Sequence, residues 1–249
     1  MTSTADLLLI ASALLFGLRH GIDWDHIAAI TDITASQEKT RDGLWLGTVY
    51  ALGHGTVLAA LGLLAVWAGT TLPSWVDGVM ERVVGITLLI LGVYVIYSLL
   101  KDRENFRMRS RWMLLFEWAE IGYHKLMHKL TGVETEHPTR QRNYGFTSAY
   151  LVGLIHGVGA ETPTQVLLFV AAAGAAGSRM GVLLVLIFIL GLFISNSIIT
   201  MMSTFGFISA RKNTPALVIL GSLAAVFSLT VGSIFLLGQG GVLPAFFGG

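Results

Sequence analysis

The stretch His20-Gly-Ile-Asp23-Trp-Asp25-His26 places two imidazoles and two carboxylates inside an apolar run from Ala5 to Ile33. Ionisable side chains in such a run cost roughly 2.5–3.5 kcal/mol each on insertion scales and by default mark a functional site. Four of them together need a cation, a water-filled cavity or each other. Imidazole suits nickel, cobalt, zinc, copper and iron. The cluster therefore predicts a site for a divalent transition-metal ion, with a bracing His–Asp pair or a proton relay as the alternatives.

A regular helix would not bring these four side chains together. Each residue turns by about 100°, so His20 and His26 would lie about 120° apart, and Asp25 would point away from His20. Gly17 and Gly21 permit a kink or an unwound turn. Non-helical backbone is tolerated within a membrane where it lines a cavity. We therefore expect a broken helix near Gly21, with both imidazoles turned toward one ion.

Three later apolar runs contain further polar groups. His54 lies between two glycines that allow close helix approach, and it is either a third imidazole of the site or a structural hydrogen-bond donor. The segment His156-Gly-Val-Gly-Ala-Glu161 is followed by Pro163, which predicts a broken helix because proline removes a backbone donor. Asn196, between two serines, either bonds neighbouring helices or joins the site. The candidate metal-binding residues are therefore His20, Asp23, Asp25, His26, His54, His156, Glu161 and Asn196.

Composition indicates an all-α polytopic membrane protein. Hydrophobic residues make up 54% of the chain and charged residues 12%. Six apolar runs each exceed the ~20 residues that cross a bilayer as a helix. They are Ala5–Ile33, Gly43–Gly69, Val76–Leu100, Phe146–Gly174, Arg179–Phe207 and Pro215–Leu237. We read the first as a retained span, because no basic segment or clear cleavage site accompanies it.

The six predicted spans form two related halves. Phe16–Asp25 aligns with Val152–Glu161 without a gap, with Gly, Leu, His and Gly matching and an acidic residue five places after each His. Leu52-Gly53 aligns less strongly with Leu190-Gly191. Because three spans is an odd number, the halves enter the membrane in opposite senses, as in many secondary transporters. The prediction is two inverted three-helix repeats, residues 1–100 and 146–249, joined by a linker, residues 101–145.

The distribution of Lys and Arg predicts the orientation. Thirteen of them follow the first, third and fifth spans, which places these segments in the cytoplasm and both termini outside the cytoplasmic membrane. Within the cytoplasmic linker, residues 112–130 form an amphipathic interfacial helix. Glu120, His124 and His128 share its polar face, where a solvated surface is favoured over a metal site. The net charge of +1 predicts no nucleic-acid partner, and the absence of cysteine excludes thiolate ligands.

The motifs resemble those of the nickel/cobalt transporter family. His20-x4-Asp25-His26, preceded by Arg19 and followed by Ile-Ala-Ala-Ile, is similar to the family signature. Leu52-Gly-His54-Gly-Thr56-Val, Gly159-Ala-Glu161-Thr-Pro-Thr-Gln165 and Leu190-Gly191 through Asn196-Ser197 resemble its later motifs, in family order. Glu161 and Asn196 stand where the family has Asp, Gln165 stands where it has Glu, and His156 is an additional imidazole. The family usually has eight spans, and on this alignment the missing pair includes its first helix.

The resemblance implies a permease for nickel or cobalt, carried as substrate and not held as a cofactor, with iron, zinc and manganese left open. Uptake is favoured over export or a role as an assembly partner of a metalloenzyme. An intramembrane zinc enzyme is the alternative from another class; His-Glu-x-x-His is absent, so no enzyme is predicted. The expected partners are the divalent ion and the lipid bilayer, and homo-oligomerisation stays open.

Overall fold

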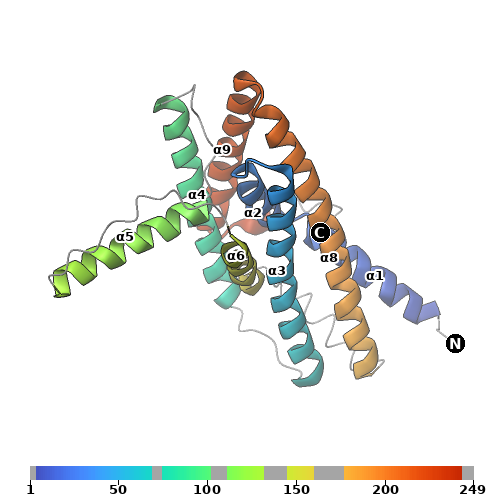
Figure 1. Ribbon diagram of the computed structural model, residues 1–249. Coiled ribbons are helices and arrows are strands. Elements are labelled where there is room, and N and C mark those ends of the chain that lie inside the picture. Colours follow the sequence, from blue (N-terminus) through green and yellow to red (C-terminus); the bar gives the residue numbers. More distant parts are fainter. Residues whose placement is uncertain (1–3, 69–74, 102–110, 132–144, 160–176, 243–249) are drawn as a thin grey trace.

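The computed structural model describes residues 4–68, 75–101, 111–131, 145–159 and 177–242. Within these ranges every regular element is a helix (Figure 1). Helices satisfy all backbone hydrogen bonds within one segment, which an apolar chain in a bilayer requires. The predicted all-helical class is therefore confirmed for the described residues.

The first apolar run is broken where the sequence predicts. Helix α1 (Thr4–His20) ends at the first histidine of the cluster, and α2 (Trp24–Ala35) begins four residues later. The two axes differ in direction by 54°. The intervening turn is held by hydrogen bonds from the amides of Gly21, Ile22 and Asp23 to the carbonyls of Gly17, Arg19 and His20. The cluster therefore occupies the corner between two half-helices.

Four other helices are long and apolar enough to cross a membrane. They are α3 (Thr40–Ala68), α4 (Trp75–Lys101, apolar from Glu81), α8 (Ser178–Ala210) and α9 (Thr214–Leu236). With the bent pair α1–α2 counted as one span, the described residues contain five candidate spans. Helix α6 (Phe146–Gly159) is apolar and shorter, and a single 3₁₀ turn, Gly240–Val242, follows α9. The predicted break near Pro163 lies outside the described residues.

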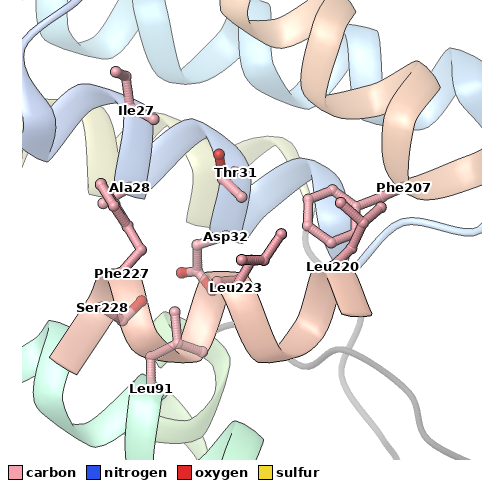
Figure 2. Close-up of a pocket in the computed structure, with 11 residues that line it drawn as sticks. Ile27, Ala28, Thr31, Asp32, Leu91, Phe207, Leu220, Leu223, Phe227 and Ser228 are labelled. Carbon is pink, nitrogen blue, oxygen red and sulfur yellow. The ribbon is translucent and has the colours of Figure 1, made fainter. Parts of the chain in front are cut away.

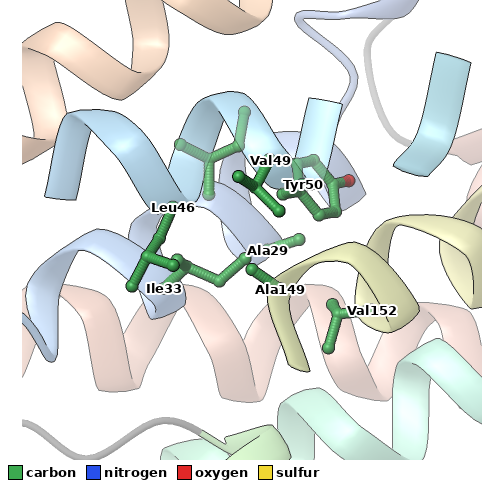
Figure 3. Packing of buried hydrophobic residues seen from close by; sticks show 8 residues of the cluster. Ala29, Ile33, Leu46, Val49, Tyr50, Ala149 and Val152 are labelled. Carbon is green, nitrogen blue, oxygen red and sulfur yellow. The ribbon is translucent and has the colours of Figure 1, made fainter. Parts of the chain in front are cut away.

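Close helix crossings at glycine bring the spans together. Helix α1 crosses α8 where Gly17 lies against the backbone of Phe188, and α3 crosses α6 where Gly153 lies against the backbone of Tyr50. Helix α4 packs along α9, and α3 also packs along α8. Figure 3 shows the resulting core between α2, α3 and α6. It comprises Ala29, Ile30, Ile33, Leu46, Val49, Tyr50, Ala149 and Val152. This core lies directly beside the histidines, so it fixes their backbone positions.

Helix α5 (Arg111–Thr131) extends away from the other helices in Figure 1. Its existence agrees with the amphipathic helix predicted for the linker. Trp118 and Tyr123 are exposed on it, as are Glu117 and His128. Exposed aromatic rings beside charged groups suit a helix at a membrane surface. That placement stays a prediction.

A cavity of about 230 Å³ lies between α2, α4, α8 and α9 (Figure 2). Its wall is mainly apolar, with Leu91, Phe207 and Phe227 among the lining residues. Asp32 and Ser228 are buried polar groups of this wall, and Figure 2 shows Asp32 directed from α2 toward α9. None of the predicted metal-binding residues lines this cavity. The histidine cluster is therefore a separate feature.

Candidate metal site

Four histidines from four helices meet in the interior. His20 is the last residue of α1, His26 is in the first turn of α2, His54 is in the middle of α3 and His156 is near the end of α6. None is more than 2% exposed. The break at Gly21 lets His20 and His26 face each other, with ring centroids 4.7 Å apart. A continuous helix would have separated them.

One imidazole has the same ring nitrogen of two others close to its own. Nε2 of His54 lies 3.3 Å from Nε2 of His20 and 3.3 Å from Nε2 of His26. A ring nitrogen carries either one hydrogen or one lone pair, so a single nitrogen makes one linear hydrogen bond. Two equal contacts at Nε2 of His54 therefore exceed what hydrogen bonding between the rings provides. The three residues form a group able to hold a metal ion.

The separations match those of ligands around one ion. Nitrogens bound to a tetrahedral metal at 2.0–2.1 Å lie about 3.3–3.4 Å from one another. The two Nε2 contacts of His54 have this length. The ligand set would be all imidazole and completely buried, which favours a borderline transition metal over magnesium or calcium.

Asp25 connects the fourth histidine to this group. Its Oδ1 accepts hydrogen bonds from Nδ1 of His26 at 3.0 Å and from the His26 amide at 2.9 Å. Its Oδ2 lies 3.1 Å from Nε2 of His156, which donates to it. A proton on Nδ1 of His26 leaves Nε2 with a lone pair on the edge that faces Nε2 of His54. Asp25 thus orients His26 as outer carboxylates orient metal-binding histidines.

Asp23 has a weaker relation of the same kind with His20. Its Oδ2 lies 3.4 Å from Nδ1 of His20, on the ring edge opposite Nε2. Asp23 is at the N-cap position of α2, and its side chain makes no capping hydrogen bond there. It is 38% exposed, against 17% for Asp25. Asp23 is therefore the part of the cluster that is most open to the surroundings.

The structure brings seven of the eight predicted residues into one region. Asn196 lies on α8 beside the break, where a methyl group at Gly21 would be 3.1 Å from its Oδ1. Its side chain is fully buried, and neither amide atom has a hydrogen-bond partner among the described residues. Among the described residues, the Asn196 side chain makes no hydrogen bond to any of the histidines. Glu161 lies outside the described residues.

Sequence reasoning did not identify the aromatic rings that pack on the cluster. The Phe188 ring lies 5.5 Å from that of His20, and the Tyr50 ring lies 5.8 Å from that of His156. The signal for both was present, because the shift that aligns Leu52-Gly53 with Leu190-Gly191 also aligns Tyr50 with Phe188.

Comparison with known proteins then assigns the chain to a family. The family NicO, described as high-affinity nickel-transport protein, matches residues 7–240. The chain belongs to this family. The resemblance of the histidine motifs to a nickel/cobalt transporter signature is thereby confirmed. The family's description is that of a transport protein, which agrees with the prediction that the chain is not an enzyme.

Individual relatives bear related names. The chain is 30% identical to the cobalt transport protein NhlF of Rhodococcus rhodochrous over 70% of this chain and 52% of the relative. It is 26% identical to the nickel transporter NicT of Mycobacterium tuberculosis over 68% and 48%. It is 24% identical to the urease accessory protein UreH of Bacillus sp. (strain TB-90), over 90% of each chain. The chain thus spans about half the length of the two matched transporters. No solved structure matches it.

Proposed function

We propose that the chain is a membrane permease that carries nickel or cobalt ions into the cell. The observation that carries this proposal is that Nε2 of His54 lies at tetrahedral ligand spacing from Nε2 of both His20 and His26, within one group of three buried imidazoles. Family membership and the names of two transporter relatives support the choice of metal. A bare ion crossing an apolar region needs groups that replace its hydration shell, and buried imidazoles supply them.

The proposed ligands are the three histidines, with Asp25 and Asp23 holding His26 and His20 in orientation. His156 supports Asp25 from α6 and so couples the second half of the chain to the site. Asn196 supplies a buried oxygen next to the break in the first span. Imidazole must be neutral to bind metal, so protons compete with the ion and uptake should weaken as the pH falls.

The proposed architecture is six spans arranged as two inverted three-helix repeats. Gly17 against Phe188 and Gly153 against Tyr50 are equivalent crossings, because the repeat aligns Gly17 with Gly153 and Tyr50 with Phe188. The same aromatic rings lie on the corresponding histidines, His20 and His156. The same glycine crossing and the same aromatic–histidine contact thus occur once in each half, which supports an internal repeat.

The contacts α3–α8 and α4–α9, which join the second and third predicted spans of the two halves, support the inverted orientation of the halves. Along the α3–α8 contact, Gly47 lies against Thr200 and Gly62 against Val185, so residue numbers rise on one helix as they fall on the other. The α4–α9 contact has the same antiparallel sense, since Gly85 lies against Gly232 and Gly92 against the Ala225 carbonyl. The second and third predicted spans of the two halves therefore pack antiparallel to each other, which supports the inverted arrangement.

The proposed orientation places the ends of α2, α4 and α8 in the cytoplasm. Ala35, Leu99 and Ala210, near these three ends, belong to one buried cluster. Nη2 of Arg211 also donates a hydrogen bond to the Ala35 carbonyl at 2.8 Å. The Lys- and Arg-rich segments that follow these helices thus start from one side of the molecule, and the positive-inside rule assigns that side to the cytoplasm.

Uptake of ⁶³Ni²⁺ or ⁵⁷Co²⁺ by cells expressing the chain tests the proposal. His20→Ala and His26→Ala should each abolish accumulation, while the amount of protein in the membrane fraction stays at the wild-type level. His128→Ala provides the matched control, because it removes an exposed imidazole on α5, outside the cluster. Normal accumulation by either cluster variant would contradict the proposal.

Two alternatives are separated by flux measurements. An exporter would lower cellular metal content, and an intramembrane zinc enzyme would show hydrolysis without flux in proteoliposomes. The match to a urease accessory protein over 90% of both chains favours a second role, in which the imported ion supplies a metalloenzyme. In that case, loss of uptake should be accompanied by loss of metal in that enzyme and corrected by excess metal in the medium.

A further inference from the structure

Helix α8 has an unusual polar face, which begins beside the proposed metal site and continues toward the C-terminal end of the helix. Asn196, Thr200 and Thr204 are spaced four residues apart, so they lie on one side of the helix. They are 0%, 2% and 0% exposed. Their side chains have no hydrogen-bond partner among the described residues. A buried polar group left without a partner costs about 1–3 kcal/mol, so three in a row call for a physical explanation.

Other hydroxyls in the described helices behave differently. Thr34, Thr48, Thr56, Ser195, Ser222 and Ser233 each donate to the carbonyl four residues earlier. Thr34 also meets Ser203 of α8 at 2.6 Å. Ser203, on the α2 side of α8, therefore has a partner, whereas the Thr200 and Thr204 hydroxyls, on the α3 side, have none among the described residues. This contrast within one helix shows that ordinary helical bonding does not account for Thr200 and Thr204.

Glycines on α3 face these hydroxyls. Gly47 lies against Thr200, and a methyl group at Gly43 would lie 2.8 Å from Cγ2 and 2.9 Å from Oγ1 of Thr204. No side chain therefore separates the hydroxyls from the α3 backbone. Thr200 and Thr204 follow Asn196 by about 6 and 12 Å along the axis. The polar face thus runs from the break beside His20 toward the end of α8 at Ala210.

We propose that Thr200 and Thr204 line the route by which the divalent ion leaves the histidine site toward the ends of α2 and α8. This inference rests on the proposed transport function. The hydroxyl oxygens replace part of the ion's hydration as it passes, and the glycine–threonine contacts close the route in the present conformation. Opening it requires α3 and α8 to separate at Gly43 and Gly47. The hydroxyls are left without partners in the closed state because their partner is the passing ion.

Proteoliposomes containing a metal-sensitive dye test the route. Thr200→Val and Thr204→Val keep the shape and remove the hydroxyl, and each should slow Co²⁺ influx about tenfold, which corresponds to about 1.4 kcal/mol in the barrier. Equilibrium Co²⁺ binding, measured by its visible absorption in detergent, should be unchanged. Thr200→Ser and Thr204→Ser should keep the wild-type rate. Thr48→Val is the matched control, since Thr48 lies exposed on α3 with its hydroxyl bonded to Leu44.

The outcomes distinguish the two levels of the proposal. Influx at the wild-type rate in both valine variants overturns the route and leaves the permease intact. Failure of the unsubstituted protein to bind or carry Co²⁺ overturns the permease itself. Loss of binding together with influx in the valine variants would show a role at the histidine site and also overturns the route.

Cysteine labelling provides a measurement that does not depend on the valine variants. The natural chain has no cysteine, so Thr200→Cys and Thr204→Cys would each carry the only thiol. During Co²⁺ transport both should react with a charged methanethiosulfonate reagent applied to the side of the α8 C-terminus. Thr48→Cys should not react. Absence of labelling at both positions during active transport would overturn the route.

Discussion

In the first half of the chain, α3 directs His54 at the imidazoles of His20 and His26, whereas in the second half α8 has Leu192 at the equivalent position of the repeat. Both side chains are buried, and both residues lie against a glycine in a first-span segment of the other half: His54 against Gly157 of α6, and Leu192 against Gly21 after α1. The packing of the two halves is therefore alike, while their chemistry differs. A repeat can keep its crossings and still concentrate the ligands in one half, because glycine contacts determine the crossings and other side chains determine binding.

Replacing His54 by leucine would give the first half the side chain of the second, and it should produce the largest effect. Loss of the imidazole that contacts both other ligands should weaken Co²⁺ binding more than about 100-fold, beyond the range expected for outer groups. Titration followed by the absorption of bound Co²⁺ measures the affinity. His128→Leu controls for the same replacement on α5. Retention of affinity within tenfold would show that His54 only packs.

Asp25→Asn tests how the second half contributes to the site. The carboxylate accepts hydrogen bonds from both His26 and His156, and an amide cannot accept from both with equal strength. We expect a loss of affinity of about 10–100-fold, as for other outer carboxylates. His156→Ala should cost less, because His26 keeps its bond to Asp25.

A double-mutant cycle joins the two substitutions. If His156 acts through Asp25, the effects of Asp25→Asn and His156→Ala are not additive. Additive losses would mean that His156 binds the ion directly. In that case the ligands would be shared between the halves, and the contrast between His54 and Leu192 would lose its significance.

Much of this site could be predicted from the sequence, because rotation about a helix is a local property. Since His20 and His26 could not share one face of a straight helix, a break at Gly21 followed, and the 54° bend confirms it. The role of Asp25 could not be predicted in this way. On a straight helix it points away from His20, and its bond to His156 joins residues 131 positions apart.

Thr200 and Thr204 were missed for a different reason. A threonine in an apolar helix ordinarily bonds to its own backbone, as Thr48 and Thr56 do. The same sequence is compatible with a hydroxyl that bonds to its own helix backbone and with one that is directed at a neighbouring helix. Only the glycines opposite these positions distinguish the two cases, and the pairing of α3 with α8 is a long-range contact. The Ser195-Asn196-Ser197 group gave a signal because three polar residues together are rare in such a run.

The glycine crossings allow a direct comparison of the two halves. Gly17→Ala and Gly153→Ala would each press a methyl group into the backbone of the crossing helix. Overpacking of this kind costs about 1–3 kcal/mol, so both should lower the midpoint of thermal unfolding, and by similar amounts. Circular dichroism in detergent measures the change. Gly206→Ala on α8 is the control, since nothing lies within 4 Å of the added carbon and alanine favours the helix.

Unequal losses would bear on the repeat itself. If Gly17→Ala destabilises the protein and Gly153→Ala does not, then the two crossings are not equivalent, and the resemblance between them is local. Equal losses without a change in Co²⁺ affinity would show that packing and chemistry are separate properties of the repeat.

Asp23→Asn should have the smallest effect. Asp23 and Asp25 each approach Nδ1 of a ligand histidine, but Asp23 does so at 3.4 Å and 38% exposure, against 3.0 Å and 17% for Asp25. Water competes for an exposed carboxylate, and pairs of this kind contribute about 0.2–1 kcal/mol, or about fivefold at most in affinity. The loss should shrink further at high salt, whereas that of Asp25→Asn should not. A loss equal to that of Asp25→Asn would make Asp23 a direct ligand, because only a bond to the ion would give an exposed carboxylate so large a contribution.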